Sequence, residues 1–372
     1  MKKAWFTGAF FIVFIAQLSA QKMMLVENNS AFERNEIISV PYAKFSKHFG
    51  LDTVFSVVDE NGKNIPHQLE KLGMSKPVNV LLQVSLQAHA KLKLLLIDKP
   101  SERINSKTYA RYVPERFDDF AWENDVLAFR MYGKALEGRA DDAQGMDVWA
   151  KRTDQLIVDK WYKTGDYHQD HGEGLDYYSV GQTLGAADVG FYINDQLTYG
   201  KHYRRYKILD NGPLRTTFRL EFDPEEVSGQ QIVLSKQISL DAGCNFNKIT
   251  LNFENYAKAS TSIAIGIVKR KEEKPLIKAG AEPFSLTYWE PEMGSNGVLG
   301  IAVVMPDSKV KWINDRPEQT LLITEVRNKK NFTYFNGAAW NKAGKINNEE
   351  EWIMAVERYK KQLKEPLKVI LK

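Results

Sequence analysis

The residues best suited to chemistry lie between positions 122 and 192, where aromatic rings, carboxylates, cations and histidines alternate with few aliphatic side chains. The run 166–178 is the densest and reads Asp-Tyr-His-Gln-Asp-His-Gly-Glu-Gly-Leu-Asp-Tyr-Tyr. A pyranose has an apolar face that stacks on aromatic rings, and a belt of hydroxyls that takes hydrogen bonds. This composition therefore predicts the cleft of a protein that binds or converts carbohydrate.

Proton transfer in such a cleft needs groups that titrate at accessible cost. Histidine takes or gives a proton near neutral pH, so His168 and His171 are the candidate bases. Arginine grips a carboxylate with a planar fork, which suits Arg152 to an acidic sugar. Tyr177 and Tyr178 are the candidate acids, and together these five residues form the predicted catalytic set.

Further aromatic, amide and charged groups in or just after this segment could hold a uronic-acid or sulfated sugar. The tryptophans could equally belong to a core, and the cations could pair with nearby carboxylates. The predicted substrate-binding residues are Trp122, Asn124, Arg130, Trp149, Lys151, Trp161, Glu173, His202 and Tyr203.

A metal site is an alternative use of the same run. His168, Asp170 and His171 are ligand types that suit zinc or calcium. Their spacing argues against it on a strand, because His168 and Asp170 would share one face and His171 would face away. We expect no cofactor, with a divalent metal as the alternative.

The N-terminal sequence points to an exported protein. Lys2, Lys3 and the apolar run to Leu18 predict a signal peptide over 1–20, hence a periplasmic or secreted product without a transmembrane segment. The single cysteine, Cys244, rules out an intramolecular disulfide. No block of basic residues runs along one element, so the sequence does not suggest a nucleic-acid partner. Lys269-Arg270-Lys271, followed by two glutamates, is typical of a solvated turn. Oligomeric state stays open.

Short alternating segments predict an all-β chain. We expect a small N-terminal β-sandwich over 21–100, a surface linker over 101–120 and a large antiparallel β-sandwich over 121–372 that carries the cleft. The expected strands are 36–40, 53–58, 78–86, 91–97, 216–222, 231–240, 247–253, 262–268, 298–304 and 320–324.

One helix is expected, near the C-terminus. Acids at 349–351 suit the positive end of a helix dipole, and apolar residues from Trp352 to Leu363 recur at helical spacing. Pro366 ends the pattern, so the helix should span 349–364, and 366–371 could form an edge strand.

Several of these motifs resemble a known family. The runs at 122–125, 129–133, 147–152 and 167–176 resemble the secreted bacterial family called domain of unknown function 4861. The resemblance implies a supersandwich similar to that of aldose (galactose) mutarotases and several polysaccharide lyases. A looser resemblance is to an oligosaccharide dehydratase of polysaccharide-utilisation loci that acts in the breakdown of ulvan.

The function that these expectations favour is elimination on a uronic-acid-containing oligosaccharide, by a dehydratase or a lyase. The alternatives are a glycoside hydrolase with paired carboxylates and a glycan-binding protein without turnover. The acids available to the hydrolase are Glu123, Asp125, Glu173 and Asp176.

Overall fold

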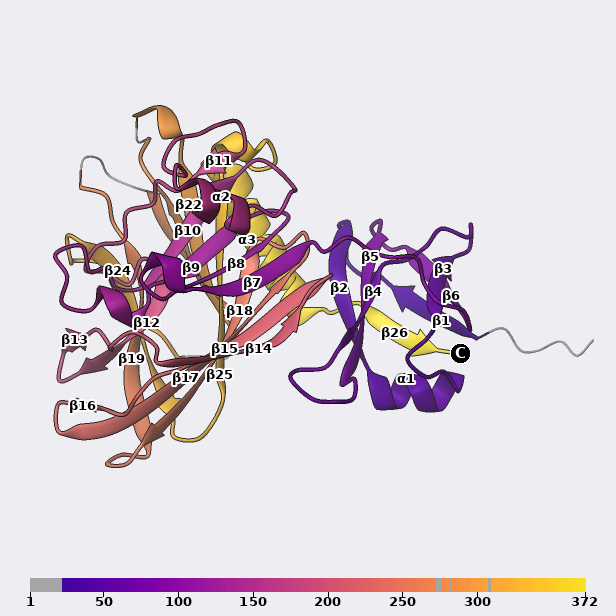
Figure 1. Cartoon of the computed structure of the whole chain (residues 1–372), viewed down its shortest axis with the longest axis horizontal. Helices are drawn as coiled ribbons and strands as arrows, with labels where there is room; N and C mark the ends of the chain where they lie inside the picture. Colours follow the sequence, from indigo (N-terminus) through magenta and orange to yellow (C-terminus); the bar gives the residue numbers. More distant parts are fainter. Residues whose placement is uncertain (1–21, 272–275, 282, 293, 307–308) are drawn as a thin grey trace, which may run out of the picture.

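Two β-sandwiches lie side by side in the computed structural model, which describes residues 22–271, 276–281, 283–292, 294–306 and 309–372 (Figure 1). The strands within each sheet pair antiparallel. The predicted class, an all-β chain of antiparallel sandwiches with a C-terminal helix, is confirmed. The predicted signal peptide, 1–20, lies outside the described residues.

The small sandwich uses both ends of the described chain. Its first sheet contains, in order, β26 (Lys368–Leu371), β1 (Met23–Glu27), β6 (Lys91–Ile97) and β3 (Ser56–Asp59). Its second sheet contains β2 (Arg34–Pro41), β5 (Asn79–Leu86) and β4 (His67–Glu70). The C-terminal strand predicted at 366–371 is present as β26, and it closes this sheet by pairing with β1.

The large sandwich contains three sheets. The first orders β11 (Gly174–Leu175), β10 (Met146–Lys151), β9 (Ala128–Met131), β8 (Asp119–Asn124) and β7 (Thr108–Val113). The second orders β13 (Gln196–Thr198), β12 (Ala186–Ile193), β19 (Ser260–Val268), β24 (Gln319–Arg327) and β23 (Lys311–Ile313).

The third sheet has nine strands and is the base of the large sandwich. It orders β14 (Arg205–Asn211), β15 (Arg215–Glu221), β17 (Gln230–Asp241), β18 (Phe246–Asn255), β25 (Phe332–Trp340), β22 (Leu299–Met305), β21 (Phe284–Trp289) and β20 (Leu276–Gly280), with β16 (Glu225–Val227) paired to β17.

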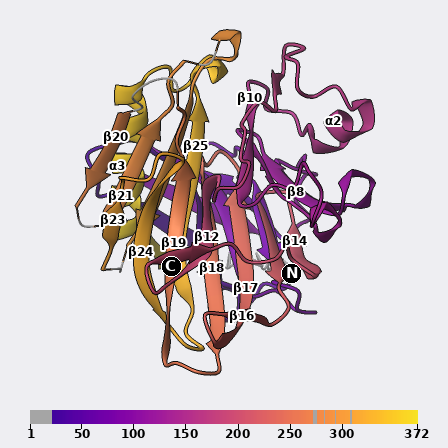
Figure 2. The same ribbon diagram turned by 90° about the vertical axis from the view of Figure 1, so that its left-hand side faces the viewer.

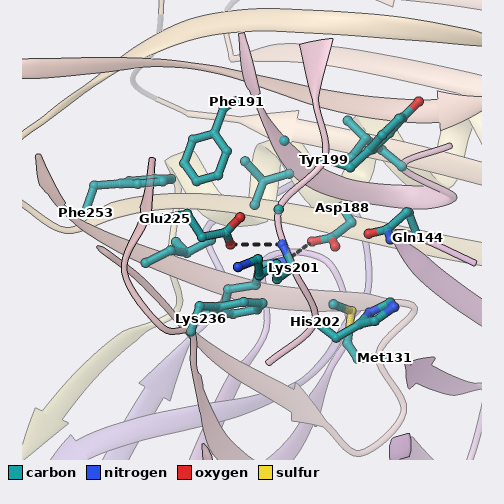
Figure 3. A pocket seen from close by; sticks show the side chains of 17 residues that line it. Met131, Gln144, Asp188, Phe191, Tyr199, Lys201, His202, Glu225, Lys236 and Phe253 are labelled. Atoms are coloured by element: carbon teal, nitrogen blue, oxygen red, sulfur yellow. Dashed lines mark hydrogen bonds and ion pairs between the residues drawn. The ribbon is translucent and has the colours of Figure 1, made fainter. Parts of the chain in front are cut away.

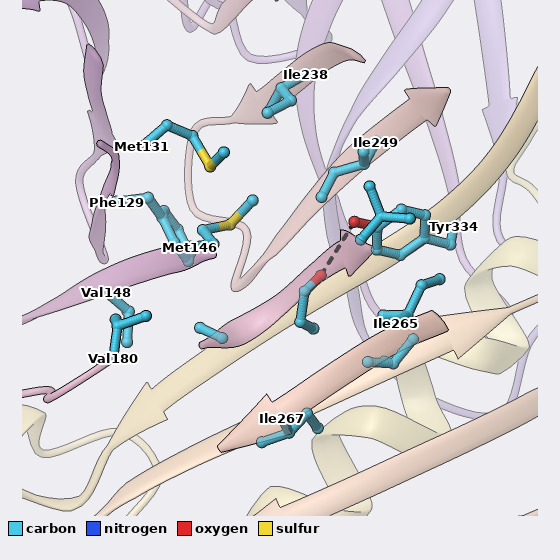
Figure 4. Packing of buried hydrophobic residues seen from close by; sticks show 14 of the residues in the cluster. Phe129, Met131, Met146, Val148, Val180, Ile238, Ile249, Ile265, Ile267 and Tyr334 are labelled. Carbon is cyan, nitrogen blue, oxygen red and sulfur yellow. Dashed lines mark hydrogen bonds between the residues drawn. The ribbon is translucent and has the colours of Figure 1, made fainter. Parts of the chain in front are cut away.

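The main core fills the space between the nine-stranded sheet and the other two (Figure 2). Ile238 and Ile249 of the base face Met131 and Met146 of the first sheet and Ile265 of the second (Figure 4). Polar bonds also cross this layer, among them that from the Tyr334 hydroxyl to the Ala187 carbonyl oxygen at 3.0 Å. The alternation in the predicted strands thus places one apolar face of the base against two covering sheets.

Three parts of the expectation need correction. The predicted linker, 101–120, contains β7, which pairs along its length with β8 because Tyr109, Arg111 and Tyr112 suit a half-buried strand. The predicted large domain, 121–372, loses its last strand to the small sandwich. Two short helices, α1 (Tyr42–Phe49) and α2 (Val158–Thr164), occur where only strands and loops were expected; each ends at a left-handed glycine.

The predicted C-terminal helix is confirmed as α3 (Glu349–Lys364). Its N-terminus is capped by Asn348, whose Oδ1 accepts a hydrogen bond from the Glu351 amide at 2.9 Å. Trp352 and Val356 pack against the outer face of the nine-stranded sheet. None of the helices in the described part of the chain is both long and apolar enough to cross a membrane.

Replacing Trp352 with alanine should remove most of the contact between α3 and the sheet. The side chain is fully buried and stacks on Phe246, so we expect a loss of about 3–5 kcal/mol in the free energy of unfolding. Denaturant unfolding measures it. Met354→Ala is the control, since Met354 is 52% exposed on the same helix and its loss should cost under about 0.5 kcal/mol. Equal losses would contradict this packing.

Candidate functional site

The candidate site forms where β10 ends and the 166–176 segment folds back on it. β11 pairs with β10, and the Arg152 amide donates to the Glu173 carbonyl oxygen at 2.9 Å. Gly174 is at φ +121°, and a Cβ there would collide with the Ala150 backbone. The glycine is therefore required for the return of the chain beside Arg152.

Arg152 lies at the surface of this turn, with its side chain 32% exposed. Its Nη2 bonds Asp170, its Nε donates to the Gly172 carbonyl oxygen at 3.1 Å, and its guanidinium lies 5.3 Å from the Trp340 ring centroid. Burial alone would raise the pKa of Asp170, but hydrogen bonds from the Gly172 and Gly174 amides and from Arg152 outweigh it and lower that pKa. The loop thus holds a cation in a defined position that solvent can reach.

His168 is more exposed, at 64% of its side chain, and it is oriented by one hydrogen bond. Its Nδ1 lies 2.9 Å from the Asp176 carbonyl oxygen. A carbonyl only accepts, so Nδ1 carries the proton and the Nε2 of the neutral ring is free to accept one. His171 is 61% exposed and instead contacts Asp166, itself 58% exposed, at 3.0 Å. His168 is the better supported base, because its partner belongs to a rigid part of the fold.

That rigid part is a buried cluster of charge around Arg130. Arg130 Nη2 lies 2.5 Å from Asp147 and 3.0 Å from Asp176, and its Nη1 lies 3.8 Å from Asp119. Burial raises the pKa of Asp119 to about 6 against the pull of Arg130. It also raises the pKa of Asp147 and Asp176, helped at Asp147 by the charge of Asp176. Arg130 was expected to bind substrate, but it is 4% exposed and serves this cluster.

Lys151 also needs correction as a substrate-binding residue. It is 1% exposed and donates to Glu123 at 2.8 Å. Glu123 in turn accepts from the amides of Ile157 and Val158, both at 2.8 Å, so it caps the N-terminal turn of α2. The pair therefore fixes α2 beside the candidate site. Burial lowers the pKa of Lys151, against the attraction of Glu123.

The predicted stacking platforms are core residues. Trp122 is fully buried and donates to Asn247 at 2.8 Å, and Trp149 is fully buried and stacks on Trp161, which is 6% exposed. Asn124 is also buried, where its amide donates to the carbonyl oxygens of Asp241 and Cys244. Their rings and amide are used by the protein itself, so none of the four presents a surface to a sugar.

The two candidate acids differ in exposure. Tyr178 is 3% exposed beneath Arg270, while Tyr177 is partly buried, and the hydroxyl oxygens of both are buried. Burial raises the pKa of Tyr177, and the charge of Glu290 adds to it. Tyr177 therefore keeps its proton and gives it up less readily than an exposed tyrosine does.

Sequence reasoning missed three residues beside this tyrosine pair. Arg270, expected in a solvated turn, has a side chain only 10% exposed and bonds Glu290 at 2.7 Å. Glu290 Oε2 has no partner among the described residues, and burial raises the pKa of Glu290. Trp340 ends β25 under Arg152. Only the mixed charge of the 269–273 run hinted at Arg270, and no local signal marked the other two.

His202 and Tyr203 lie elsewhere, where Tyr203 forms a parallel β-bridge with Gly133 just after β9. Tyr203 is 4% exposed and donates to the Asp118 carbonyl oxygen at 2.5 Å. His202 contacts Asp142 at 2.9 Å and lines a narrow pocket of about 30 Å³ that is also lined by the Lys236–Asp188 pair (Figure 3). That volume holds about two water molecules rather than a sugar ring. Both residues are therefore structural, which corrects their prediction as substrate-binding.

The metal alternative does not fit this geometry. His168, Asp170 and His171 contact Asp176, Arg152 and Asp166 respectively, so they do not share a centre. Across the described ranges, no three His, Cys, Asp or Glu side chains are grouped as metal ligands.

The comparison with protein families is decisive for membership. The model of the family described as "Domain of unknown function (DUF4861)" matches residues 26–369. The chain belongs to this family. "Uncharacterized protein P7" from Formosa agariphila is 29% identical over 278 residues, covering 70% of this chain and 69% of that protein.

Two solved structures share the fold of this DUF4861 protein. A glycosyl hydrolase family 38 protein from Enterococcus faecalis and an alpha-mannosidase from Enterococcus faecalis V583 each match with a TM-score of 0.54 and 10% identity. The matches cover 95% and 94% of this chain but 47% and 46% of those chains. The DUF4861 chain thus spans about half of their length, and the likeness concerns the fold.

Removing the Lys151 amine should leave Glu123 charged and buried. We expect Lys151→Met to lower the free energy of unfolding by about 3–5 kcal/mol, measured by denaturant unfolding. The control is Lys160→Met, because Lys160 pairs with Glu173 at 2.8 Å while 60% exposed; it should cost under about 1 kcal/mol. A Lys151→Met protein as stable as the wild type would show that the pair does not support α2.

Asp119 should make stability depend on pH. Its pKa is raised from 3.8 to about 6 in the folded protein. The stabilising effect of this carboxyl is therefore complete below the pKa of Asp119 in the unfolded chain, and it is lost as pH rises through the pKa of Asp119 in the folded protein. The free energy of unfolding should fall by about 3 kcal/mol over that window through this group.

Urea unfolding from about pH 4 to about pH 8 tests this contribution. Asp119→Asn cannot titrate and should show a shallower decline, while Asp195→Asn, at an exposed turn, should follow the wild type. Identical slopes for Asp119→Asn and the wild type would contradict the shift.

Proposed function

We propose that this protein catalyses elimination on a uronic-acid-containing oligosaccharide, as a dehydratase or a lyase. The observation that carries the proposal is the joint anchoring of Arg152 and His168. Both side chains are exposed, and both bond the same 168–176 segment, Arg152 through Asp170 and Gly172 and His168 through Asp176.

Elimination from a uronate begins with removal of the C5 proton beside the carboxylate. A cation must neutralise that carboxylate, a base must take the proton, and an acid must protonate the leaving oxygen. Arg152 supplies the cation, and His168 supplies Nε2 as the base. Tyr177 is assigned as the proton donor because it is the more exposed of the two tyrosines. Its raised pKa keeps the hydroxyl protonated and also makes it a weak acid. A dehydratase would release the C4 hydroxyl as water and leave a 4,5-unsaturated sugar.

The comparisons support the carbohydrate class of this proposal. Both solved structures of similar fold come from proteins whose names refer to sugar hydrolysis, a glycosyl hydrolase and an alpha-mannosidase. The resemblance to an ulvan-oligosaccharide dehydratase favours elimination and an acidic polymer such as ulvan. The N-terminal sequence predicts export to the periplasm or beyond, and an exported protein can meet such polymers there.

The paired-carboxylate hydrolase is the second candidate, favoured by the names of those two structures. Two of the acids predicted for a hydrolase cannot reach a substrate, because Glu123 is fully buried and paired with Lys151, and Asp176 is 3% exposed and paired with Arg130. Asp125 and Glu173 remain. Asp125 is partly exposed and accepts from the Gly243 amide at 2.6 Å, and Glu173 has its side chain 30% exposed and its pKa lowered by Lys160. A lowered pKa suits a nucleophile or base rather than a general acid.

Loss of the base should act on the chemical step. We expect His168→Ala to lower kcat by about 10²–10⁴-fold with little change in KM, and Arg152→Ala to lower kcat and raise KM, because it holds the carboxylate before and during reaction. The rate is followed by the ultraviolet absorbance of the conjugated unsaturated uronate, on uronate oligosaccharides.

His171→Ala is the matched control, since it removes an exposed histidine three residues away that bonds an exposed Asp166; it should change kcat less than tenfold. Glu173→Gln should retain turnover. If His168→Ala is fully active, or if Glu173→Gln alone is dead, the assignment of the base is wrong.

A further inference from the structure

A groove lies away from the candidate site, at the junction of the two sandwiches; Figure 1 shows where the two sandwiches meet. It has a volume of about 900 Å³, and its walls come from β2 of the small sandwich, the outer face of the nine-stranded sheet and α3. Ligand sites commonly have volumes of about 300–1,000 Å³. Neither Arg152 nor His168 lines this groove.

The junction is firmly held, so the groove has a fixed shape. Gln68 of the small sandwich accepts hydrogen bonds from the amides of Leu214 and Arg215, both at 2.8 Å. Arg34 donates to the Glu365 carbonyl oxygen at 2.9 Å, directly after α3. These bonds join β4 and β2 to the large sandwich on two sides of the groove.

The two long walls offer both apolar and polar groups. On α3, the lining face extends from Glu351 to Leu363, a length of about 18 Å, and it includes the exposed Met354 and the partly buried Tyr359, one face of which stacks on Phe246. The sheet wall opposite includes amide, hydroxyl and amine groups, from Gln237, Ser239, Lys248 and Thr250. A groove that offers both apolar and polar groups suits a chain of sugar rings, which has apolar faces and hydroxylated edges.

The charges of the groove are not balanced. Its buried or half-buried acids are already paired, Glu36 with Arg34 and both Glu70 and Asp241 with Arg215. Glu351 accepts from the Asn347 amide beside the start of α3.

The unpaired charges in the groove are mainly positive. Lys248, Lys345 and Arg358 line the groove, are exposed, and have no ion-pair partner in the part of the chain that the structure describes. The lining acids without an ion-pair partner among the described residues are the exposed Glu33 and the half-buried Glu351. Three unpaired cations therefore stand against two unpaired acids in the groove.

We propose that this groove is a second binding site, which holds a segment of an acidic oligosaccharide. The sugar class rests on the proposed function, but the groove is separate from the Arg152–His168 site. Lys248 and Arg358 bind the carboxylates or sulfates of the chain, while Tyr359 and Met354 contact the apolar faces of its rings. Such a site would keep a long substrate on the protein between turnovers.

Isothermal titration calorimetry on the full chain tests this site directly. The background is Arg152→Ala with His168→Ala, which weakens the candidate site and stops turnover, and the probe is a uronate-containing tetrasaccharide prepared from ulvan. This protein should still bind the probe. Adding Lys248→Ala and Arg358→Ala should weaken binding at least about tenfold, since each loses a hydrogen bond to a charged group.

Matched variants separate the groove from general surface charge. Arg327→Ala with Lys330→Ala removes the same charge at exposed positions outside the groove and should leave the affinity unchanged in the same background. Asn35→Trp, on the β2 wall, should block binding by bulk without changing charge. Circular dichroism checks that each variant is folded.

Three results would overturn the proposal: no binding in the Arg152→Ala, His168→Ala background, equal losses in the groove and control variants, or equal affinity for a neutral tetrasaccharide. Failure of the proposed function is seen separately, as absence of an unsaturated product from the wild type while binding to the groove persists.

Discussion

A buried guanidinium governs the arrangement of the candidate site. Arg130 is removed from water, and an unpaired charge there would be very costly, so carboxylates must accompany it. Asp119 comes from β8, Asp147 from β10, and Asp176 from the segment after β11. One cation thereby ties two strands and the returning segment to β9. Because the Asp176 carbonyl oxygen orients His168, the exposed histidine inherits its position from this buried pairing.

The charged residues of the 122–176 region therefore divide into two groups. Arg130, Lys151 and their partner acids lie inside and fix the scaffold, with Glu123 also capping α2. Arg152 and His168 lie outside, where solvent and substrate can reach them. The inner group fixes the positions of Arg152 and His168, and proton transfer at one chosen carbon requires such fixed positions.

The sequence predicted elements better than it predicted exposure. The helix at 349–364 was predictable because its acids, apolar spacing and terminal lysines all agree. The strands of the nine-stranded sheet alternate clearly, as β17 and β18 show. The α2 helix was not predictable, because its N-terminus depends on Glu123, which lies far away in sequence. The β7 strand was hidden by its polar residues at the edge of its sheet.

Exposure was harder to predict from the sequence, because a tryptophan close to a carboxylate in the sequence occurs both in binding clefts and in protein cores. Trp122 and Trp149 are core residues whose indole nitrogens find Asn247 and Asp147 inside the protein. Arg270 was misjudged because its partner, Glu290, lies twenty residues further on, after β20 and β21. Arg152 and His168 kept their predicted exposure because glycines and a turn hold their segment at the surface.

Mass spectrometry of products tests the central claim most directly. The purified protein would be incubated with a defined uronate oligosaccharide, and the masses of all products would be compared with that of the substrate. The account predicts elimination: either a product lighter by one water with its chain length unchanged, or two fragments whose masses sum to that of the substrate. Fragments whose masses sum to substrate plus one water would show hydrolysis and contradict the account, as would an unchanged substrate.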